Sequence, residues 1–304
     1  VRRREVRGGG PQIVVTRASP AVVRYMNDVL LPRIKQSREW KPSPSQPHNP
    51  DPMVRIITDA RLSAIDLRFV DPKAEDDPSS KLNLMIDKII ETHGRTKDDS
   101  FTDPVSGKAD PVKGAAQIVF SPVGFGEGVA ASRGFDLRAH VMRRLAKAGI
   151  KAGEVAWMGD YSTDAKKQAM FKEMRAGTKR ILFGSPKNMG TGVNVQKRLK
   201  ALHYMAPPWY PADVEQRHGR ILRQGNQNQE VELHWYATKG TYDSTGWGMV
   251  ARKARFIEDA FAGDASVREI DDVTEVSQYE MASALAAGDE RAIRLANLNT
   301  EIGR

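Results

Sequence analysis

Short apolar runs alternate with amphipathic segments through the middle of the chain. The apolar runs are QIVFSPV (117–123), EVAWMG (154–159), RILFGSP (180–186), ALHYMAP (201–207) and VELHWYA (231–237). Two of the intervening segments, from Asp136 to Ala148 and from Asp164 to Ala176, begin at an aspartate that can cap a helix and are followed by glycine. Strands that alternate with helices in this way predict an α/β protein with a parallel sheet covered by helices on both faces.

The regions that flank this pattern are different. Residues 20–39 have apolar positions at helical spacing and predict a helix broken at Pro32, and the proline-rich stretch 41–52 predicts a linker or surface loop. After Tyr242 the pattern is helical again. We therefore expect an N-terminal helical segment with its linker (1–53), a sheet domain (54–242) and a helical C-terminal extension (243–304).

One predicted helix, from Ala212 to Gln224, has an unusual set of side chains. Gln216, Arg220 and Arg223 lie at positions i, i+4 and i+7 and are predicted to share one face, while Gly219 leaves room for a close approach. Such a face can bind an anionic ligand. The alternative is a solvated basic helix whose arginines only complement the negative end of the helix dipole.

A glycine-containing loop follows the strand at 180–184. Gly190 and Gly192 are interspersed with the polar residues Thr191, Asn194 and Gln196. Such a loop can present backbone N–H groups to a phosphate, although glycines after strands also serve simply as turn formers. Because only one strand separates this loop from the arginine helix, we expect both features at the carboxyl edge of the sheet, where ligands of open α/β sheets bind.

The composition favours a nucleic-acid partner and argues against several other classes of protein. The chain has 47 Lys and Arg against 38 Asp and Glu, a net charge of +9, which favours a polyanionic partner. There is no cysteine, and no pair of histidines has the spacing of a zinc site, so we expect no metal centre in the chain itself. No apolar run approaches the ~20 residues that span a bilayer, which predicts a cytoplasmic protein without membrane contact.

Taken in order, these motifs resemble the second RecA-like lobe of superfamily 2 helicases, especially Swi/Snf-type DNA translocases. The sequence GTGVNVQ is similar to motif V of that family, Gln216, Gly219, Arg220 and Arg223 match the Q-x-x-G-R-x-x-R pattern of motif VI, and QIVFSP is similar to motif IV. Further stretches at 59–83, 206–228 and 255–272 look like large phage- and plasmid-borne proteins that join such a helicase to an N6-adenine DNA methyltransferase. The sequence departs from the family at Asp164, where many relatives have arginine, and at Asn226, where glutamine is usual.

The resemblance implies a cofactor, a partner and roles for individual residues. ATP with Mg²⁺ would bind between two lobes, Arg220 and Arg223 would act as arginine fingers, and Gln216 would support them. The nucleotide would also contact Gly190, Thr191, Gly192, Asn194 and Gly219. DNA would be held, mainly through its phosphate backbone, by Ser121, Lys187 and Gln196.

The P-loop that such an ATPase requires is missing from this chain. The only Gly-Lys pair near a loop, Gly107-Lys108, lacks both the preceding glycine and the following Ser or Thr. We therefore expect a chain that is inactive alone and needs an N-terminal P-loop lobe, encoded either in the same natural polypeptide or separately. The resemblance also implies a linked DNA methyltransferase.

Two other functions have some support in the sequence. APPW (206–209) and GFGEG (124–128) resemble methyltransferase motifs, but Ala206 has no oxygen that could accept a hydrogen bond from a target amino group. The stronger alternative is a non-catalytic, basic DNA-binding module on a degenerate helicase fold.

Overall fold

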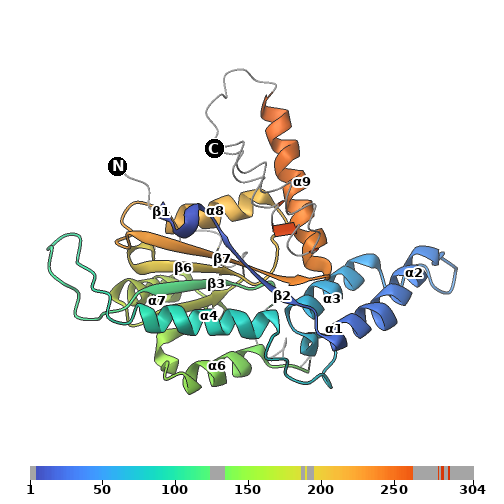
Figure 1. The fold of residues 1–304 in the computed structure, drawn as a ribbon, viewed down its shortest axis with the longest axis horizontal. Coiled ribbons are helices and arrows are strands. Elements are labelled where there is room, and N and C mark those ends of the chain that lie inside the picture. Colours follow the sequence, from blue (N-terminus) through green and yellow to red (C-terminus); the bar gives the residue numbers. More distant parts are fainter. Residues whose placement is uncertain are drawn as a thin grey trace.

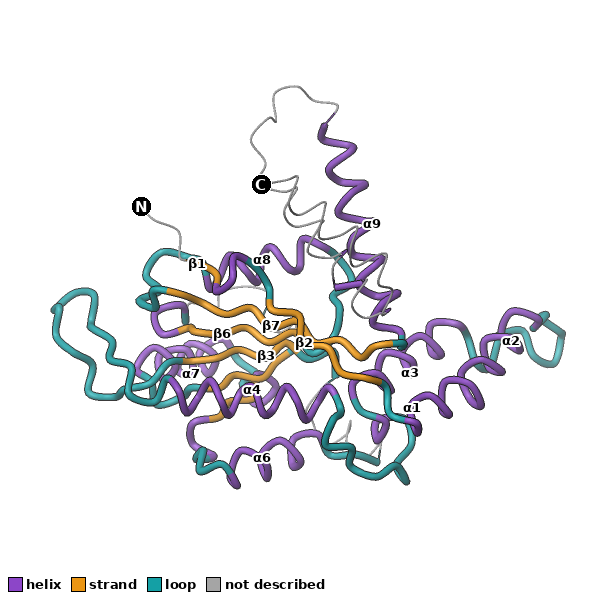
Figure 2. The backbone as a smooth tube through the Cα atoms, in the orientation of Figure 1, coloured by secondary structure: helices purple, strands orange, loops and turns teal. Residues whose placement is uncertain are grey.

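The centre of the protein is a single parallel β-sheet. The computed structural model describes residues 5–123, 134–185, 189 and 195–262, together with 280, 282, 283 and 287. In these residues the sheet has seven strands, β1 (Glu5–Val6), β2 (Gln12–Arg17), β3 (Ala116–Phe120), β4 (Val155–Trp157), β5 (Ile181–Gly184), β6 (Leu199–Tyr204) and β7 (Glu230–Lys239). Their order is β4-β5-β3-β6-β7, with β1 and β2 both paired to β7, so all carboxyl ends lie at the same edge (Figures 1 and 2).

Helices cover both faces of this sheet. The described helices are α1 (Pro20–Tyr25), a π-helical turn (Met26–Leu30), α2 (Leu31–Glu39), α3 (Met53–Ile65), α4 (Lys81–Arg95), α6 (Leu137–Lys147), α7 (Asp164–Ala176), α8 (Pro211–Ile221) and α9 (Tyr242–Ala262). Short 3-10 turns lie at Arg7–Gly9, Leu67–Phe69, Ala152–Glu154, Met158–Asp160 and Gln196–Arg198. The predicted fold class, a parallel sheet with helices on both faces, is therefore confirmed.

Successive side chains of each strand point to opposite faces of the sheet, so the interior is divided into two apolar cores. In β3, Ile118 and Phe120 point into a core shared with α7, α8 and α9, whereas Val119 points into a core shared with α3, α4 and α6. Trp235 of β7 stacks on Trp247 of α9, with ring centroids 4.4 Å apart. The central strands are buried on both sides, which is why they appear in the sequence as continuous apolar runs.

The N-terminal region contributes to the sheet as well as to the helices. Strand β2 pairs with β7 over its whole length, from Gln12 opposite His234 to Arg17 opposite Lys239. The sequence pattern did not predict this strand. Helices α1, α2 and α3 then project together from one end of the molecule (Figure 1). Arg33 of α2 pairs with Asp51 of the linker at 2.7 Å and with Asp59 of α3 at 3.0 Å.

Two local predictions in the helices were wrong. Pro32 does not break the N-terminal helix, because the chain forms a π-helical turn just before it, in which the Leu31 N–H donates to the Met26 carbonyl. Because of this turn, the helix continues past Pro32 even though proline has no N–H to donate. Helix α7 is capped by the Thr163 hydroxyl, which accepts a hydrogen bond from the Lys166 N–H, and Asp164 is the first helical residue. The predicted aspartate cap of α6 is confirmed at Asp136.

The C-terminal extension begins as the helix that its sequence predicts. Helix α9 packs Trp247, Val250 and Ala254 into the core beneath α8. Ala282 is fully buried in the same core, and the Ser283 hydroxyl donates to the carbonyl of Ser244. At least part of the extension is therefore integrated with the sheet domain.

Candidate functional site

Helix α8 follows β6 at the carboxyl edge and is shorter than predicted. Pro211 occupies its first turn and Asp213 lies near its positive end, but the helix ends at Ile221 rather than at Gln224. Arg223 therefore lies outside the helix, in a turn that is completed by Gly225 with φ +90°. The expectation that Gln216, Arg220 and Arg223 share one helical face was wrong.

Asn226 determines where the helix ends. Its amide Nδ2 donates to the carbonyl of Ile221 and to the carbonyl of Leu199, both at 2.8 Å, and its Oδ1 accepts two hydrogen bonds from Asn228. The side chain is fully buried. Asn226, which stands where the helicase pattern usually has glutamine, is therefore a structural residue that joins the end of α8 to the start of β6.

Replacing Asn226 by alanine should destabilise the protein by about 2–3 kcal/mol, because two buried carbonyls and the Asn228 amide lose their partner. Urea denaturation of the variant would measure this loss. Gln224→Ala, an exposed change two residues earlier, is the matched control and should lie within about 0.5 kcal/mol of the wild type. Equal stability of the two variants would contradict the capping role.

Arg220 points inward from α8. It is 8% exposed, and its guanidinium donates to the carbonyl of Met189. Burial, followed by the nearby charges of Arg217 and Arg223, lowers the pKa of Arg220. Met189 in turn packs against Gly184 so closely that a side chain at that position would collide with its sulfur. Arg220 thus connects α8 to the loop that follows β5.

The other motif residues, on this helix and just beyond it, face solvent. Gln216, Gly219 and Arg223 are all exposed, and a Cβ atom built on Gly219 would meet nothing within 4 Å. The surface beside Gly219 is therefore open to a second protein surface or a ligand. Gln196, the first residue of the 3-10 turn before β6, is half-buried, and its amide donates to the carbonyl of Gln224 at 3.5 Å.

Most of the glycine loop cannot be placed against these residues. Lys187, Gly190, Thr191, Gly192 and Asn194 lie outside the described residues. The described ends of the segment are Ser185, at the carboxyl end of β5, and Val195, which is buried in the core. Ser185 lines the same crevice as Asp213 and Arg217 of α8, and Val195 belongs to the core cluster that includes Val214 and Ile221 of that helix.

Ser121 was predicted to contact a DNA phosphate, but it is fully buried. Its hydroxyl donates to the carbonyl of Val123 at 3.0 Å and accepts a hydrogen bond from the Val123 N–H at 3.1 Å. These bonds form a tight turn just after β3. The side chain therefore shapes the loop and offers no surface group to a phosphate.

Sequence reasoning missed Arg217, which lies on the inward side of α8. It is 5% exposed, and its guanidinium carbon lies 4.7 Å from the ring centroid of Phe120 and 5.3 Å from that of Tyr204. Its carboxylate neighbour Asp213 is one turn earlier, at 3.9 Å. An arginine buried among aromatic rings at the carboxyl ends of β3 and β6 adds a positive charge where ligands of such sheets bind.

His218 is buried beside Arg217 in a neutral form. Burial first, and then the charge of Arg217, lowers its pKa to about 3. In the described residues its Nε2 has no hydrogen-bond partner, and its ring stacks on Trp235 with centroids 6.2 Å apart. Since the unfolded chain takes up a proton near pH 6.5 and the folded state does not, the contribution of His218 to stability is complete above pH 6.5 and is lost as the pH falls towards 3.

Acidification from pH 7.5 to 5 should therefore cost about 2 kcal/mol of unfolding free energy through His218, at about 1.4 kcal/mol per pH unit. His218→Phe, which keeps a stacked ring, should lose this part of the pH dependence in urea denaturation series. The exposed His48→Phe is the control and should leave the pH dependence as in the wild type. A parallel pH profile for His218→Phe and the wild type would contradict the buried, neutral histidine.

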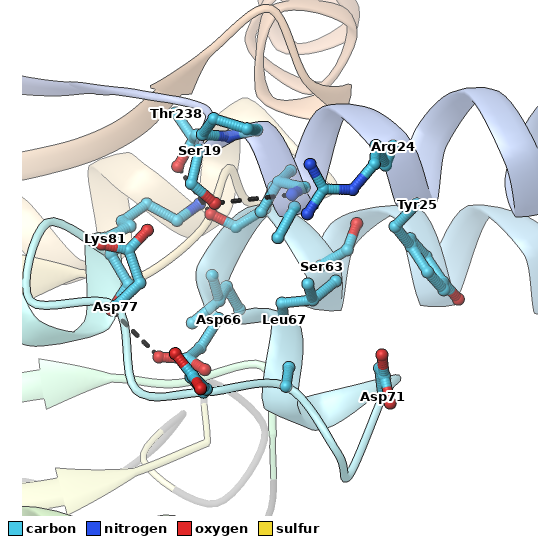
Figure 3. Close-up of a pocket in the computed structure, with 18 of the residues that line it drawn as sticks. Ser19, Arg24, Tyr25, Ser63, Asp66, Leu67, Asp71, Asp77, Lys81 and Thr238 are labelled. Atoms are coloured by element: carbon cyan, nitrogen blue, oxygen red, sulfur yellow. Dashed lines mark hydrogen bonds between the residues drawn. The ribbon is translucent and has the colours of Figure 1, made fainter.

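A cavity on the carboxyl edge is lined mainly by carboxylates. It measures about 670 Å³ and lies between the start of α1, the end of α3 and the loop before α4 (Figure 3). Asp28, Asp66, Asp71, Glu75, Asp76 and Asp77 line it, against Arg17, Arg24 and Lys81. Such an excess of carboxylates repels phosphate, so we assign no nucleotide or DNA contact to this cavity.

Neither a metal centre nor a membrane segment is found in the part of the chain that the structure describes. No group of three or more His, Asp or Glu side chains there could hold a metal ion. Among the described helices, none has both the length and the apolar character to cross a bilayer.

Comparison with known proteins supports the fold more than the activity. No family model matches the chain. It is 31% identical over 107 residues to the "Defense against restriction protein B" of Escherichia phage P1, a match that covers 35% of this chain and 5% of the length of that protein. Because the match covers so little of the P1 protein, it says nothing about the activity of that protein as a whole.

Two solved structures are similar in shape. The "SWI2/SNF2 ATPase core in complex with dsDNA" of Sulfolobus solfataricus matches over 90% of this chain and 49% of its own, with a TM-score of 0.51 and 14% identity. The "C-terminal part of Fun30 ATPase domain" matches over 82% of this chain and 90% of its own, with a TM-score of 0.49 and 10% identity, which is too low to carry an argument. The chain thus has the RecA-like fold of about half of a SWI2/SNF2 ATPase core.

Proposed function

We propose that this chain is the C-terminal motor lobe of an ATP-dependent, SWI2/SNF2-type DNA translocase or helicase. The observation that carries the proposal is the fold match over 90% of the chain, combined with the position of Gln216, Gly219, Arg220 and Arg223 at the carboxyl edge. Fold alone does not decide activity. Ligands of open α/β sheets bind at this edge, which supports a contact between the motif residues and a nucleotide.

Arg223 and Arg220 have different places in this proposal. Arg223 is exposed just beyond α8 and can extend its guanidinium towards a nucleotide held by a second lobe. There it would neutralise charge that develops on the transferred phosphate, as an arginine finger does. Arg220, bonded to the Met189 carbonyl, would hold the glycine loop against α8 and be released towards the nucleotide when the lobes close. Gln216 would orient these groups from the exposed face.

The ATP and Mg²⁺ would be bound chiefly by a P-loop lobe that this chain does not contain. The residues present fit the complementary half of such a site, since they offer cations and the open surface at Gly219. Among the described residues there is no carboxylate cluster that could hold the metal, which we therefore assign to the P-loop lobe. We propose that the P-loop lobe belongs to the same natural polypeptide and that a DNA methyltransferase is linked to it. Lys187, Gly190, Thr191, Gly192, Asn194 and Gln196 keep their proposed contacts with DNA or nucleotide.

The test is the rate of ATP hydrolysis by this chain combined with a P-loop lobe, with and without duplex DNA. We expect hydrolysis that DNA stimulates and that neither lobe produces alone. Binding of DNA without any hydrolysis would support the second candidate, a non-catalytic DNA-binding module, which the net charge of +9 also favours.

A further inference from the structure

A small crevice at the carboxyl edge contains two arginines that none of the motifs explains. It lies beyond the ends of β3, β5 and β6 and measures about 280 Å³. Arg61 of α3 and Arg217 of α8 line it together with Phe120, Ser185, Trp209 and Asp213. We call it the arginine crevice. Its two cations come from helices that are far apart in sequence, so their proximity is a product of the fold.

Both guanidinium groups are held in place by their surroundings. Arg61 donates from Nη2 to the carbonyl of Pro207 at 2.7 Å, and its guanidinium carbon lies 4.5 Å from the ring centroid of Trp209. Arg217 lies over the Phe120 ring at 4.7 Å. The rings and the carbonyl hold both planar groups in fixed orientations, and neither kind of contact removes their positive charge.

The charge balance of the crevice is positive. Asp213 is its only carboxylate among the described lining residues, and it lies 3.9 Å from Arg217. Among the described residues Arg61 forms no salt bridge; burial lowers its pKa, and the charges of Tyr242 and Asp243 oppose that shift. The charges of Arg217 and Arg223 also lower the pKa of Arg220. Arginines crowded in this way repel one another, and a bound anion would relieve that repulsion.

The size and walls of the crevice limit the anion. A volume of about 280 Å³ lies below the ~300–1,000 Å³ of pockets that enclose a drug-sized ligand, so it fits a fragment such as a phosphate group. The planar fork of arginine matches phosphate oxygens in a bidentate fashion. At the mouth, Trp209 is 46% exposed and offers a surface on which a base can stack.

We propose that the arginine crevice binds a phosphate group between Arg61 and Arg217, with the base of the same or the adjacent nucleotide stacked on Trp209. Two sources have this chemistry, the backbone of a DNA strand and a free nucleotide. The assignment to DNA rests on the proposed function, whereas phosphate binding itself does not.

The test uses the 304-residue chain and two fluorescent probes, a labelled DNA duplex and a labelled ATP analogue, with anisotropy measured over a salt series. Arg61→Gln and Arg217→Gln should each weaken binding of at least one probe. For DNA, the slope of log K against log salt should fall by about 0.9 for each phosphate contact that is lost. Loss confined to the duplex identifies the strand as the source, and loss confined to the analogue identifies the nucleotide.

Arg55→Gln is the matched control, because it removes the same charge from an exposed position of the same helix, α3. It should leave both affinities and the salt slope at the wild-type values. If the crevice variants, folded as judged by circular dichroism, bind both probes as the wild type does, the proposal is overturned. An equal loss in Arg55→Gln would overturn it as well, since the effect would then come from net charge alone.

Because Arg217 is buried, Arg217→Gln could fail to fold, and a second measurement avoids this variant. Inorganic pyrophosphate added to the wild type should change the tryptophan fluorescence saturably, and Trp209→Phe should abolish that change. Absence of a saturable change in the wild type would overturn the proposal. Since neither measurement needs a P-loop lobe, failure here is distinguishable from failure of the ATPase test.

Discussion

Arg223→Ala should reduce the DNA-stimulated ATPase rate of the assembled lobes by about 10³-fold or more, the effect expected for loss of an arginine finger. The side chain is exposed and lies outside α8, so its removal should leave the fold unchanged. The turn that carries it is fixed by Asn226, whose amide bonds to Ile221 and Leu199 do not involve Arg223. The effect should therefore appear in kcat and not in stability.

Three further variants make this result specific. Arg223→Lys keeps the charge but not the fork of donors and should recover only part of the rate. Arg38→Ala removes an exposed arginine from α2, at the far end of the helical projection, and should have no effect (Figure 1). Arg220→Ala should also lower the rate, but with a loss of stability because Arg220 is buried and bonded to Met189. An ATPase rate that is indifferent to Arg223 would leave the chain a DNA-binding module.

The central strands could be predicted from sequence because burial on both faces makes each of them a continuous apolar run. Runs such as RILFGSP therefore located β5 within two residues at either end. Strand β2 was missed, since QIVVTR is short and polar at its ends, as suits a strand that is only partly buried. The apolar triplet Ile13 to Val15, between Pro11 and Pro20, was a usable signal.

The candidate site was less predictable, because its geometry depends on tertiary contacts. The end of α8 is set by Asn226, whose bonds reach both the helix and β6, and no local pattern revealed that bridge. The periodicity of the sequence predicted that Arg220 lies on a helix, but it did not predict that the side chain points inward to Met189. No motif pointed to Arg217, since a buried arginine is recognisable only when the rings of Phe120 and Tyr204 are known to lie beneath it.

Breaking the ion pair between Lys81 and Asp243 should have the largest effect on stability. The pair joins the start of α4 to the start of α9, with 2.6 Å between Nζ and Oδ2, and the two side chains are 1% and 0% exposed. Asp243 also accepts a hydrogen bond from the Thr238 N–H at the end of β7. Burial lowers the pKa of Lys81 and raises that of Asp243, while each charge opposes the shift of the other.

Lys81→Met should destabilise the protein by about 3–5 kcal/mol, because it leaves the Asp243 carboxylate buried without its counter-charge. The double variant Lys81→Met with Asp243→Asn should recover most of that loss, since the asparagine is neutral and can still accept the Thr238 hydrogen bond. Urea denaturation at pH 7 of both single variants and the double variant gives the coupling energy as a double-mutant cycle.

The more exposed pair Lys88 with Glu91 on α4 provides the control. Its atoms are 2.8 Å apart, but the side chains are 30% and 56% exposed, so Lys88→Met should cost no more than about 1 kcal/mol. A small loss for Lys81→Met, similar to that of Lys88→Met, would mean that Asp243 takes up a proton once Lys81 is gone. The raised pKa of Asp243 favours this protonation. Protonation is more costly at pH 8.5, so repeating the measurement at that pH should enlarge the destabilisation caused by Lys81→Met.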